Sequence, residues 1–350
     1  MSGIEQRRAF LVATPGGHLD LLLALEPSFE RFRRVWVVSP GSTADALAAR
    51  GEEVRLLPRF HGLSLRNALR SVSGICHAMR DRPRLIVTSG SGSVVPYCLV
   101  SRMLGSHLVF LETMARIEGP SSTGRLLARV SKVVLVQWPE MRRFYPRARV
   151  CRPALLEGLP PARAPRRDGS GTFVSVGTHI DPFDRLLRIV DDAVDAGLLP
   201  RPVVAQSGVA SYVPRNFETT PWMAPAKIAE HLRNARWAVC HAGSGLIARS
   251  LEAGLRPLVV PRRQHFGEHV DDHQLQITAK LGDVGIVVPV ENEITARHLH
   301  DAVAERPAGD PFGGVPAMGD VLSEEIDRLL RAPNRHGPVR ARLSKRRRRV

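Results

Sequence analysis

The chain has 350 residues, of which 43% are hydrophobic and 24% charged, so it is long enough for two domains with complete cores. Its formal net charge of +16 predicts a polyanionic partner, namely nucleic acid, an anionic membrane surface or a phosphorylated substrate. Only 5% of the residues are aromatic, which argues against a nucleic-acid partner bound by base stacking, and the four cysteines form no CxxC pair, which argues against zinc.

Neither a signal peptide nor a membrane-spanning helix is predicted. The first eight residues are polar, and the apolar run Ala9–Thr14 is too short for the hydrophobic region of a signal peptide. The longest apolar stretch, Val94–Phe110, is interrupted by a proline, an arginine and a histidine, so it is a poor membrane span. We therefore expect a cytoplasmic protein that lies peripherally on the inner face of the cell membrane.

Short apolar runs alternate with helical patterns along the chain, which predicts an α/β fold with parallel sheets and crossover helices. The expected strands of the first half are Phe10–Ala13, Val35–Val38, Val54–Leu57, Leu85–Thr88, His107–Leu111 and Val133–Val136. Those of the second half are Phe173–Val176, Pro202–Ala205, Ala238–Cys240, Pro257–Val260 and Gly285–Val288.

The composition divides the chain into two Rossmann-like domains. A segment rich in proline, glycine and arginine, residues 161–171, predicts a linker between domain 1–160 and domain 172–331. Residues 332–350 end in a basic run and predict a disordered tail, which is either a solvated end, an anchor for anionic lipid or a nucleic-acid contact. A ligand cleft is expected between the domains, at the carboxyl ends of their strands.

Glycine-rich turns follow two of the expected strands in the first half. In Ala13-Thr-Pro-Gly-Gly-His18, Gly16 and Gly17 allow the backbone to approach a ligand and His18 falls on the first helical turn, although a plain turn with a solvent-facing histidine fits the same pattern. Ser89 and Gly90 belong to a second such turn, which suits a phosphate or a sugar. Neither turn has the GxGxxG or Gly-Lys-Ser/Thr pattern, so a dinucleotide site and a P-loop are not predicted.

The second half has the strongest anion-binding signal. His241-Ala-Gly-Ser-Gly245 lies between an apolar strand and a helical pattern, so free N–H groups and the positive end of a helix dipole meet there, and we expect a diphosphate. Gly177 and Thr178 end an earlier strand in the same way as Gly16–His18, and the paired turns are expected to face one cleft.

Two polar clusters have alternative interpretations. Glu112 and Arg116 follow a strand and form either a salt bridge or a pair of site residues. His269 and His273 are four residues apart, but HExxH and a third ligand are not evident, so hydrogen bonds to sugar hydroxyls from this segment are preferred over metal binding. No Asp-x-Asp motif occurs, so we expect no metal and no cofactor, with helix N–H groups and cations stabilising the diphosphate.

Together these motifs resemble a glycosyltransferase family. The second half resembles the catalytic subunit of the dolichol-pathway N-acetylglucosaminyltransferase, through Val174-Ser-Val-Gly-Thr178, Gln206-x-Gly208, His241–Gly245, Pro261-Arg-Arg263 and His269-x-Asp-Asp-His-Gln274. The first half resembles its membrane-recruiting partner, through Gly16-Gly-His18, Thr88-Ser-Gly90, Glu112-x-x-Ala-Arg116, Ser122-x-Gly124 and Gln137-Trp-Pro139. The chain is similar to a fusion of the two, nearest to the bacterial PssD/PssE-type exopolysaccharide pair and more distantly to MurG.

The resemblance implies a GT-B fold whose two domains face a central cleft. It also implies inverting, metal-independent transfer of a sugar from UDP to a polyprenyl-diphosphate-linked saccharide at a membrane surface, with no nucleic acid involved. The implied donor-binding residues are Gly177, Thr178, Met223, His241, Gly243, Ser244, Gly245, Glu252, Arg263, Asp272 and Gln274. The implied acceptor-binding residues are Gly16, Gly17, Ser89, Gly90 and Arg116.

The family pattern is broken at two points. We expect no counterpart of the membrane-anchoring helix of the eukaryotic partner, and Arg249 stands where MurG-like enzymes have an acid that holds the ribose. Glu252, on the same helical face, is the expected substitute.

His18 is the expected general base, because an imidazole with a pKa near 6.5 suits this task, and Glu112 is the alternative. Arg262 and Arg263 are expected to pair with a carboxylate, which favours a glucuronate donor over N-acetylglucosamine. Two other classes of function remain open: a basic protein that binds nucleic acid or phospholipid without catalysis, and a UDP-sugar epimerase.

Overall fold

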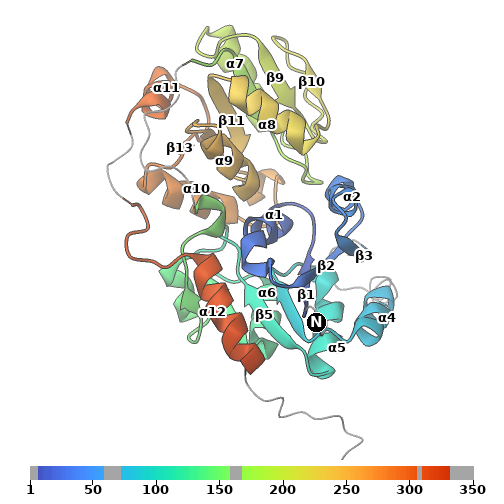
Figure 1. Cartoon of the computed structure of the whole chain (residues 1–350). Coiled ribbons are helices and arrows are strands. Elements are labelled where there is room, and N and C mark those ends of the chain that lie inside the picture. Colours follow the sequence, from blue (N-terminus) through green and yellow to red (C-terminus); the bar gives the residue numbers. More distant parts are fainter. Residues whose placement is uncertain (1–6, 59–71, 158–167, 306–309, 332–350) are drawn as a thin grey trace, which may run out of the picture.

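The computed structural model describes residues 7–58, 72–157, 168–305 and 310–331. It has two α/β domains, each built on a parallel sheet, stacked with one above the other (Figure 1). The strand order is β3-β2-β1-β4-β5-β6-β7 in the first sheet and β10-β9-β8-β11-β12-β13 in the second. The predicted α/β class with two Rossmann-like domains is confirmed.

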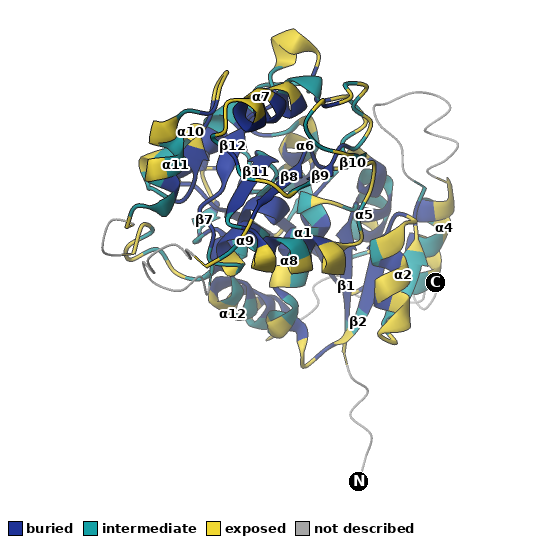
Figure 2. Cartoon of the chain, turned by 90° about the horizontal axis from the view of Figure 1, so that it is seen from above, coloured by how far each residue is buried: buried dark blue, intermediate teal, exposed yellow. Residues whose placement is uncertain are grey.

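All six strands expected in the first half are present. The sheet contains β1 (Arg8–Ala13), β2 (Arg33–Val38), β3 (Glu53–Leu56), β4 (Leu85–Thr88), β5 (His107–Leu111), β6 (Val133–Val136) and β7 (Arg149–Val150). Its described helices are α1 (Gly17–Ala24), α2 (Ser42–Ala49), α4 (Val72–Asp81), α5 (Val95–Met103) and α6 (Ser122–Val130). Successive strand residues alternate between two cores, Phe10 and Val12 on one face and Leu11 and Ala13 on the other, so the sheet is buried on both faces (Figure 2).

The second sheet has the same architecture. Its strands are β8 (Thr172–Ser175), β9 (Val203–Gln206), β10 (Thr219–Thr220), β11 (Trp237–His241), β12 (Leu258–Val260) and β13 (Val288–Pro289). Its helices are α7 (Asp184–Asp195), α8 (Pro225–Asn234), α9 (Ser244–Glu252), α10 (His273–Asp283) and α11 (Ala296–Val303). The last strand was expected at Gly285–Val288 and begins only at Val288, because Gly285, with a φ of 69°, still belongs to the turn after α10.

The C-terminal helix α12 (Met318–Arg331) differs from the expected domain division. It falls within the range 172–331 assigned to the second domain, but it packs on the first, where Met318, Leu322 and Ile326 join the same core as Leu11 and Leu22 (Figure 1). Of the expected linker, only residues 168–171 are described, and the expected tail lies outside the described residues. No described helix combines the length and the apolar character that a bilayer span needs.

Candidate active site between the domains

A pocket of about 500 Å³ lies between the two domains. The turns after β1, β2, β8 and β11 line it, and so do Met223, Trp222 and the first half of α9. The carboxyl ends of parallel strands from both sheets therefore meet at one cavity, which is where ligands bind in this class of fold.

Two helices from different domains begin at this pocket. Helix α1 starts after Gly16 and α9 after Gly243, and neither start has a side-chain cap. The starts are so close that a Cβ added to Gly17 would lie 2.7 Å from Oγ of Ser244. The first N–H groups and the positive dipole ends of both helices are thus available to one anion.

The imidazole of His241 packs against two of the pocket glycines, Gly177 and Gly243. A Cβ on Gly243 would lie 2.2 Å from Nε2 of His241, and a Cβ on Gly177 would lie 2.4 Å from Cε1. Gly177 also has a φ of 80°, a conformation that favours glycine. Burial and the nearby Arg262 guanidinium lower the pKa of His241 to about 3, so the ring is neutral and adds no charge to the pocket.

An ion pair crosses the cleft beside the helix starts. Nη2 of Arg249 lies 3.2 Å from Oδ1 of Asp20, and both residues line the pocket. A Cβ on Gly245 would lie only 2.1 Å from Oδ2 of Asp20, so this glycine gives the carboxylate its room. Burial raises the pKa of Asp20, while Arg249 opposes that shift. The position where an acid was expected thus holds a cation whose carboxylate partner comes from the other domain.

Glu252, the expected substitute for the missing acid, does not line the pocket. It is exposed at the last position of α9, eight residues after Ser244, whereas the pocket lies at the start of that helix. At about 1.5 Å per residue the two positions are roughly 12 Å apart along the axis, so sharing a helical face does not bring Glu252 to the ligand.

Two hydrogen bonds hold His18 against the second glycine turn of the first domain. Its Nδ1 lies 3.0 Å from the carbonyl oxygen of Ser89, and Oγ of Ser89 donates to the carbonyl oxygen of His18 at 2.9 Å. Because a carbonyl can only accept, Nδ1 carries the proton and Nε2 keeps its lone pair. The expected pKa near 6.5 is not found: burial, with help from Arg116 and His273, lowers the pKa of His18 to about 4.

Glu112 is buried beneath the start of α6, with 2% of its surface exposed. Its Oε2 accepts from the hydroxyl of Tyr145 at 2.8 Å, and its Oε1 accepts from the backbone N–H of Thr113 at 3.1 Å. Burial raises the pKa of Glu112 to about 7, against the effect of these hydrogen bonds. Glu112 does not line the interdomain pocket, although a carboxyl with this pKa can exchange protons near neutral pH.

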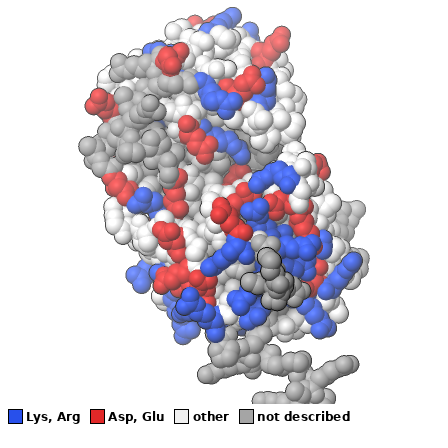
Figure 3. Space-filling model, viewed as in Figure 1, with Lys and Arg blue, Asp and Glu red and all other residues white. Residues whose placement is uncertain are grey.

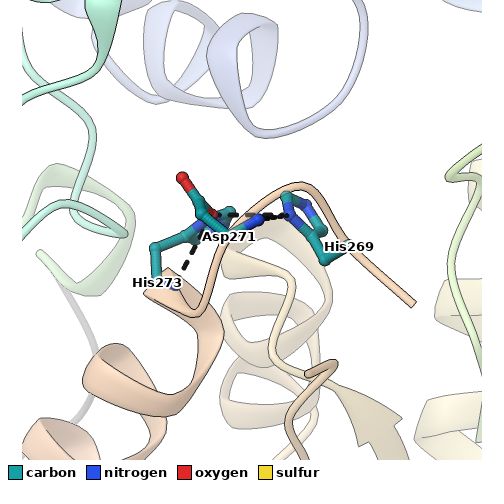
Figure 4. A group of neighbouring side chains, drawn as sticks. All are labelled: His269, Asp271 and His273. Atoms are coloured by element: carbon teal, nitrogen blue, oxygen red, sulfur yellow. Dashed lines mark hydrogen bonds and ion pairs between the residues drawn. The ribbon is translucent and has the colours of Figure 1, made fainter. Parts of the chain in front are cut away.

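Arg116 joins a polar cluster of the second domain. Its Nη1 lies 2.8 Å from Oδ2 of Asp271, whose other oxygen faces Nδ1 of both His269 and His273 (Figure 4). These contacts hold the pKa of Asp271 well below its usual range, with the hydrogen bonds from the two histidines as the largest cause. The Glu112–Arg116 segment therefore supplies a cross-domain ion pair rather than a Glu112–Arg116 salt bridge.

The same cluster supplies the third metal ligand that was not evident in the sequence. One potential ligand atom each from His269, Asp271 and His273 lies within 4.8 Å of the others. A cation bound there would compete with the Arg116 guanidinium for Asp271, and the hydrogen bonds already satisfy the carboxylate. The donor set is of the right kind, but the adjacent guanidinium makes it a poor site for a dication.

The residues expected to hold the sugar serve partly in the local structure. Oε1 of Gln274 accepts from the backbone N–H of Arg262 at 3.0 Å, and Oδ1 of Asp272 accepts from the backbone N–H of Gln264 at 2.8 Å. Neither side chain lines the pocket. Of the other residues expected to bind the donor, Met223, Thr178 and Ser244 do line the pocket.

Arg262 does not fit the expected role of pairing with a donor carboxylate. Its side chain is 1% exposed, and it donates to the carbonyl oxygens of Val176, Asp181, Pro182 and Glu268 at 2.8–3.3 Å. Burial lowers its pKa to about 10, which leaves it charged at neutral pH. Arg263 faces Glu291 at 3.7 Å and does not line the pocket.

Two parts of the pocket were missed in the sequence. Asp20 looked like an ordinary acid in the first turn of a helix, so it gave no distinguishing signal. The turn Pro40-Gly-Ser-Thr43 also lines the pocket and opens α2 without a side-chain cap. A glycine between a strand and a helix that begins with Ser or Thr is a pattern that the sequence shows, so this third helix start could have been predicted.

Two protein families match different parts of the chain. The family described as "Oligosaccharide biosynthesis protein Alg14 like" matches residues 62–153, and "Glycosyltransferase family 28 C-terminal domain" matches residues 204–308. The chain is 26% identical over 176 residues to "UDP-N-acetylglucosamine transferase subunit ALG14" of Mus musculus, covering 41% of this chain and 81% of that protein. The match to the Homo sapiens protein of that name is 32% over 75 residues, covering 20% of this chain and 35% of that protein.

A longer match, 27% identical over 342 residues, is to "UDP-N-acetylglucosamine--N-acetylmuramyl-(pentapeptide) pyrophosphoryl-undecaprenol N-acetylglucosamine transferase" of Xylella fastidiosa (strain M12), covering 86% of this chain and 87% of that protein. Among solved structures, MurG of Acinetobacter baumannii superposes with a TM-score of 0.58 at 17% identity, covering 92% of this chain and 99% of that one. UDP-N-acetylglucosamine 2-epimerase of Rickettsia bellii gives 0.62 at 9% identity, covering 93% and 96%. At these identities the solved structures show a shared fold. Together with the two family matches, this shared fold makes the chain a glycosyltransferase of the GT-B fold.

Proposed function

We propose that this enzyme transfers N-acetylglucosamine from UDP-N-acetylglucosamine to a saccharide carried on a polyprenyl diphosphate, with inversion and without a metal ion. UDP-sugar-dependent transfer is supported by the family 28 match and by relatives of both halves, whose names state N-acetylglucosamine transfer. The observation that carries the proposal is the pocket at which α1 and α9 begin within van der Waals distance of one another.

In this proposal the α9 start binds the donor diphosphate. The N–H groups of Ser244 and Gly245 and the helix dipole stabilise the negative charge of the departing UDP, and Arg249 supplies a nearby formal cation. Met223 and Trp222 line the pocket on the side of β10 and α8, and they offer apolar contact to the uracil.

His18 is the proposed general base. The acceptor hydroxyl oxygen attacks C1 of the donor sugar, its proton passes to Nε2 of His18, and the bond from C1 to the diphosphate oxygen breaks with its electron pair leaving on UDP. The hydrogen bond from Nδ1 to Ser89 fixes the tautomer that this step needs. With a pKa of about 4 the ring is a weak but fully unprotonated base at neutral pH.

The contacts of Arg262 and Arg263 bear on the identity of the donor sugar. The Nη groups of Arg262 donate to main-chain carbonyl oxygens, so Arg262 is not available to pair with a glucuronate carboxylate. Of the two arginines, only Arg263 is left for that role. N-Acetylglucosamine is therefore the first donor proposed and glucuronic acid the second. We place the acceptor at Gly16, Gly17, Ser89, Gly90 and Arg116, on the inner face of the cell membrane, in a PssD/PssE-type step of polysaccharide or glycolipid synthesis.

The deciding experiment measures UDP release by the purified chain with UDP-N-acetylglucosamine or UDP-glucuronate, with and without a lipid-linked monosaccharide in detergent. Release of UDP only in the presence of the acceptor, preserved in EDTA, is the expected result. Faster turnover of UDP-glucuronate would reverse the choice of donor. Conversion of the UDP-sugar without acceptor would replace the proposal with an epimerase, and no turnover together with intact polyanion binding would replace it with a binding protein.

A further inference from the structure

The interdomain pocket carries one charged pair whose function the transfer step explains only in part. Over the face seen in Figure 3, acidic and basic side chains lie in many neighbouring groups. The described residues that line the pocket include a single carboxylate, Asp20, and a single arginine or lysine, Arg249. They come from different domains and pair across the cleft. The proposed transfer step uses the cation Arg249 but leaves Asp20 without a role.

One oxygen of the Asp20 carboxylate is available to a ligand. Arg249 contacts Oδ1, whereas Oδ2 has no hydrogen-bond donor among the residues that the structure describes. The side chain is 20% exposed, so a molecule in the pocket can reach it. Oδ2 also lies at the diphosphate turn, 2.1 Å from the place that a Cβ of Gly245 would take. A ligand bound at this turn therefore meets an oxygen that accepts hydrogen bonds from hydroxyl groups.

Arg249 makes this carboxylate compatible with a diphosphate nearby. A lone carboxylate would repel the diphosphate, but the guanidinium cancels its charge. Burial raises the pKa of Asp20 and Arg249 opposes that shift, so the ion pair favours the ionised form. The pair thus offers a strong hydrogen-bond acceptor with little net charge.

The position of Asp20 on α1 indicates which part of the donor it faces. Asp20 lines the pocket, whereas His18 is hydrogen-bonded to the Ser89 turn and does not line it. At 3.6 residues per turn, positions 18 and 20 lie about 200° apart around the helix. His18, the proposed base, belongs to the side on which the transferred sugar reacts. Asp20 therefore belongs to the side of the nucleoside.

The ribose is the part of the nucleoside that needs a polar partner there. In the proposed arrangement the uracil contacts Met223 and Trp222 and the diphosphate lies at Ser244 and Gly245, so the ribose lies between them. Its 2′- and 3′-hydroxyl groups are neighbouring hydrogen-bond donors. A carboxylate oxygen accepts from hydroxyl groups more strongly than a neutral oxygen does.

We propose that Asp20 of the first domain binds the ribose hydroxyl groups of the UDP-sugar through Oδ2, while Arg249 of the second domain holds Oδ1. The inference rests on the proposed function, because that function places UDP in the interdomain pocket. The donor nucleoside then contacts both domains, although the second domain binds its diphosphate. The first domain thereby contributes to donor specificity as well as to acceptor binding.

Calorimetry of the full chain with UDP and with 2′,3′-dideoxy-UDP tests this contact without requiring sugar transfer. The wild type should bind UDP about tenfold more tightly or better, because the dideoxyribose leaves a carboxylate oxygen without its donors. Asp20→Ala should reduce this preference to within about twofold, while UDP still binds at the helix starts. Asp45→Ala is the matched control and should keep the wild-type preference. Asp45 is likewise the fourth residue of a helix of the first domain, but it is exposed and does not line the pocket.

Two results would overturn the ribose contact while the proposed function survives: a wild type that binds UDP and dideoxy-UDP equally well, and an unchanged preference in Asp20→Ala. A wild type that binds neither nucleotide would refute the proposed function and the ribose contact together. If Asp20→Ala lacks the wild-type circular dichroism spectrum, Asp20→Asn replaces it. Its preference for UDP should fall about threefold or more, because a neutral amide oxygen accepts a weaker hydrogen bond, and an unchanged preference there would also exclude the contact.

Discussion

Gly243→Ala tests the contact between the diphosphate turn and the His241 ring. The backbone at Gly243 has φ −83° and ψ 121°, which any residue adopts, so the new methyl group is the only perturbation. It would lie 2.2 Å from Nε2 of His241, whereas an ordinary contact is about 3.5 Å, so the ring or the turn must move by about 1 Å. Overpacking of this kind costs about 1–3 kcal/mol of stability.

The larger effect is expected on transfer. A displacement of about 1 Å moves the N–H groups of Ser244 and Gly245 away from the diphosphate and should lower kcat/KM for the UDP-sugar about 100-fold. UDP release measures the activity and urea unfolding the stability. Gly119→Ala is the matched control, because a Cβ there has nothing within 4 Å.

Removing the ring should relieve the clash. Gly243→Ala/His241→Ala is expected to recover part of the activity lost in Gly243→Ala, with a coupling of about 1 kcal/mol or more between the two positions. If Gly243→Ala retains wild-type kcat/KM, or if the two substitutions are simply additive, the steric account of this turn is wrong.

Three further predictions concern single side chains. His18→Ala should lower kcat by about 10²–10⁴-fold while UDP binding, measured by calorimetry, is kept; activity near that of the wild type would exclude His18 as the base. Because the folded-state pKa of Glu112 is raised from 4.5 to about 7, its contribution to stability is complete below pH 4.5 and is lost as the pH rises to about 7. Glu112→Gln should therefore gain in urea stability relative to the wild type across that window and no further above it, and a constant difference would refute the shift. Arg262→Met removes the donor from four carbonyl oxygens, of which those of Val176 and Glu268 are in buried hydrogen bonds, and should cost about 3 kcal/mol or more in urea unfolding. Arg263→Met should cost less than about 1 kcal/mol, and a change in donor preference without loss of stability in Arg262→Met would restore its recognition role.

The sheets were predictable because strands buried on both faces form continuous apolar runs. The two-residue strands β7 and β10 were missed, since two residues carry no periodicity. Helix α12 has a clear apolar face, but nothing in its pattern states which domain that face covers. Its packing depends on partners such as Leu11, about 300 residues earlier in the chain, and local reasoning does not reach that far.

The site was predictable where backbone conformation decides it and unpredictable where tertiary partners do. Glycine turns between strands and helices mark Gly16–Gly17 and Gly243–Gly245 in the sequence, and the structure brings them to one pocket. Arg249 finds its carboxylate 229 residues away in Asp20, and no spacing rule predicts that pair. The sequence does not distinguish the two neighbouring arginines, and only the structure shows that Arg262 is buried and donates from both Nη atoms to main-chain carbonyl oxygens.

The return of α12 to the first domain means that cutting the chain once would not separate its two halves. A break within residues 158–167 would leave the second fragment holding the first through α12, whose Met318, Leu322 and Ile326 are fully buried in the core of that domain. Such fragments would copurify as a complementing pair, with α12 as an exchanged arm. A fused chain and a two-subunit enzyme thus differ by one peptide connection, provided that this arm stays with the second subunit.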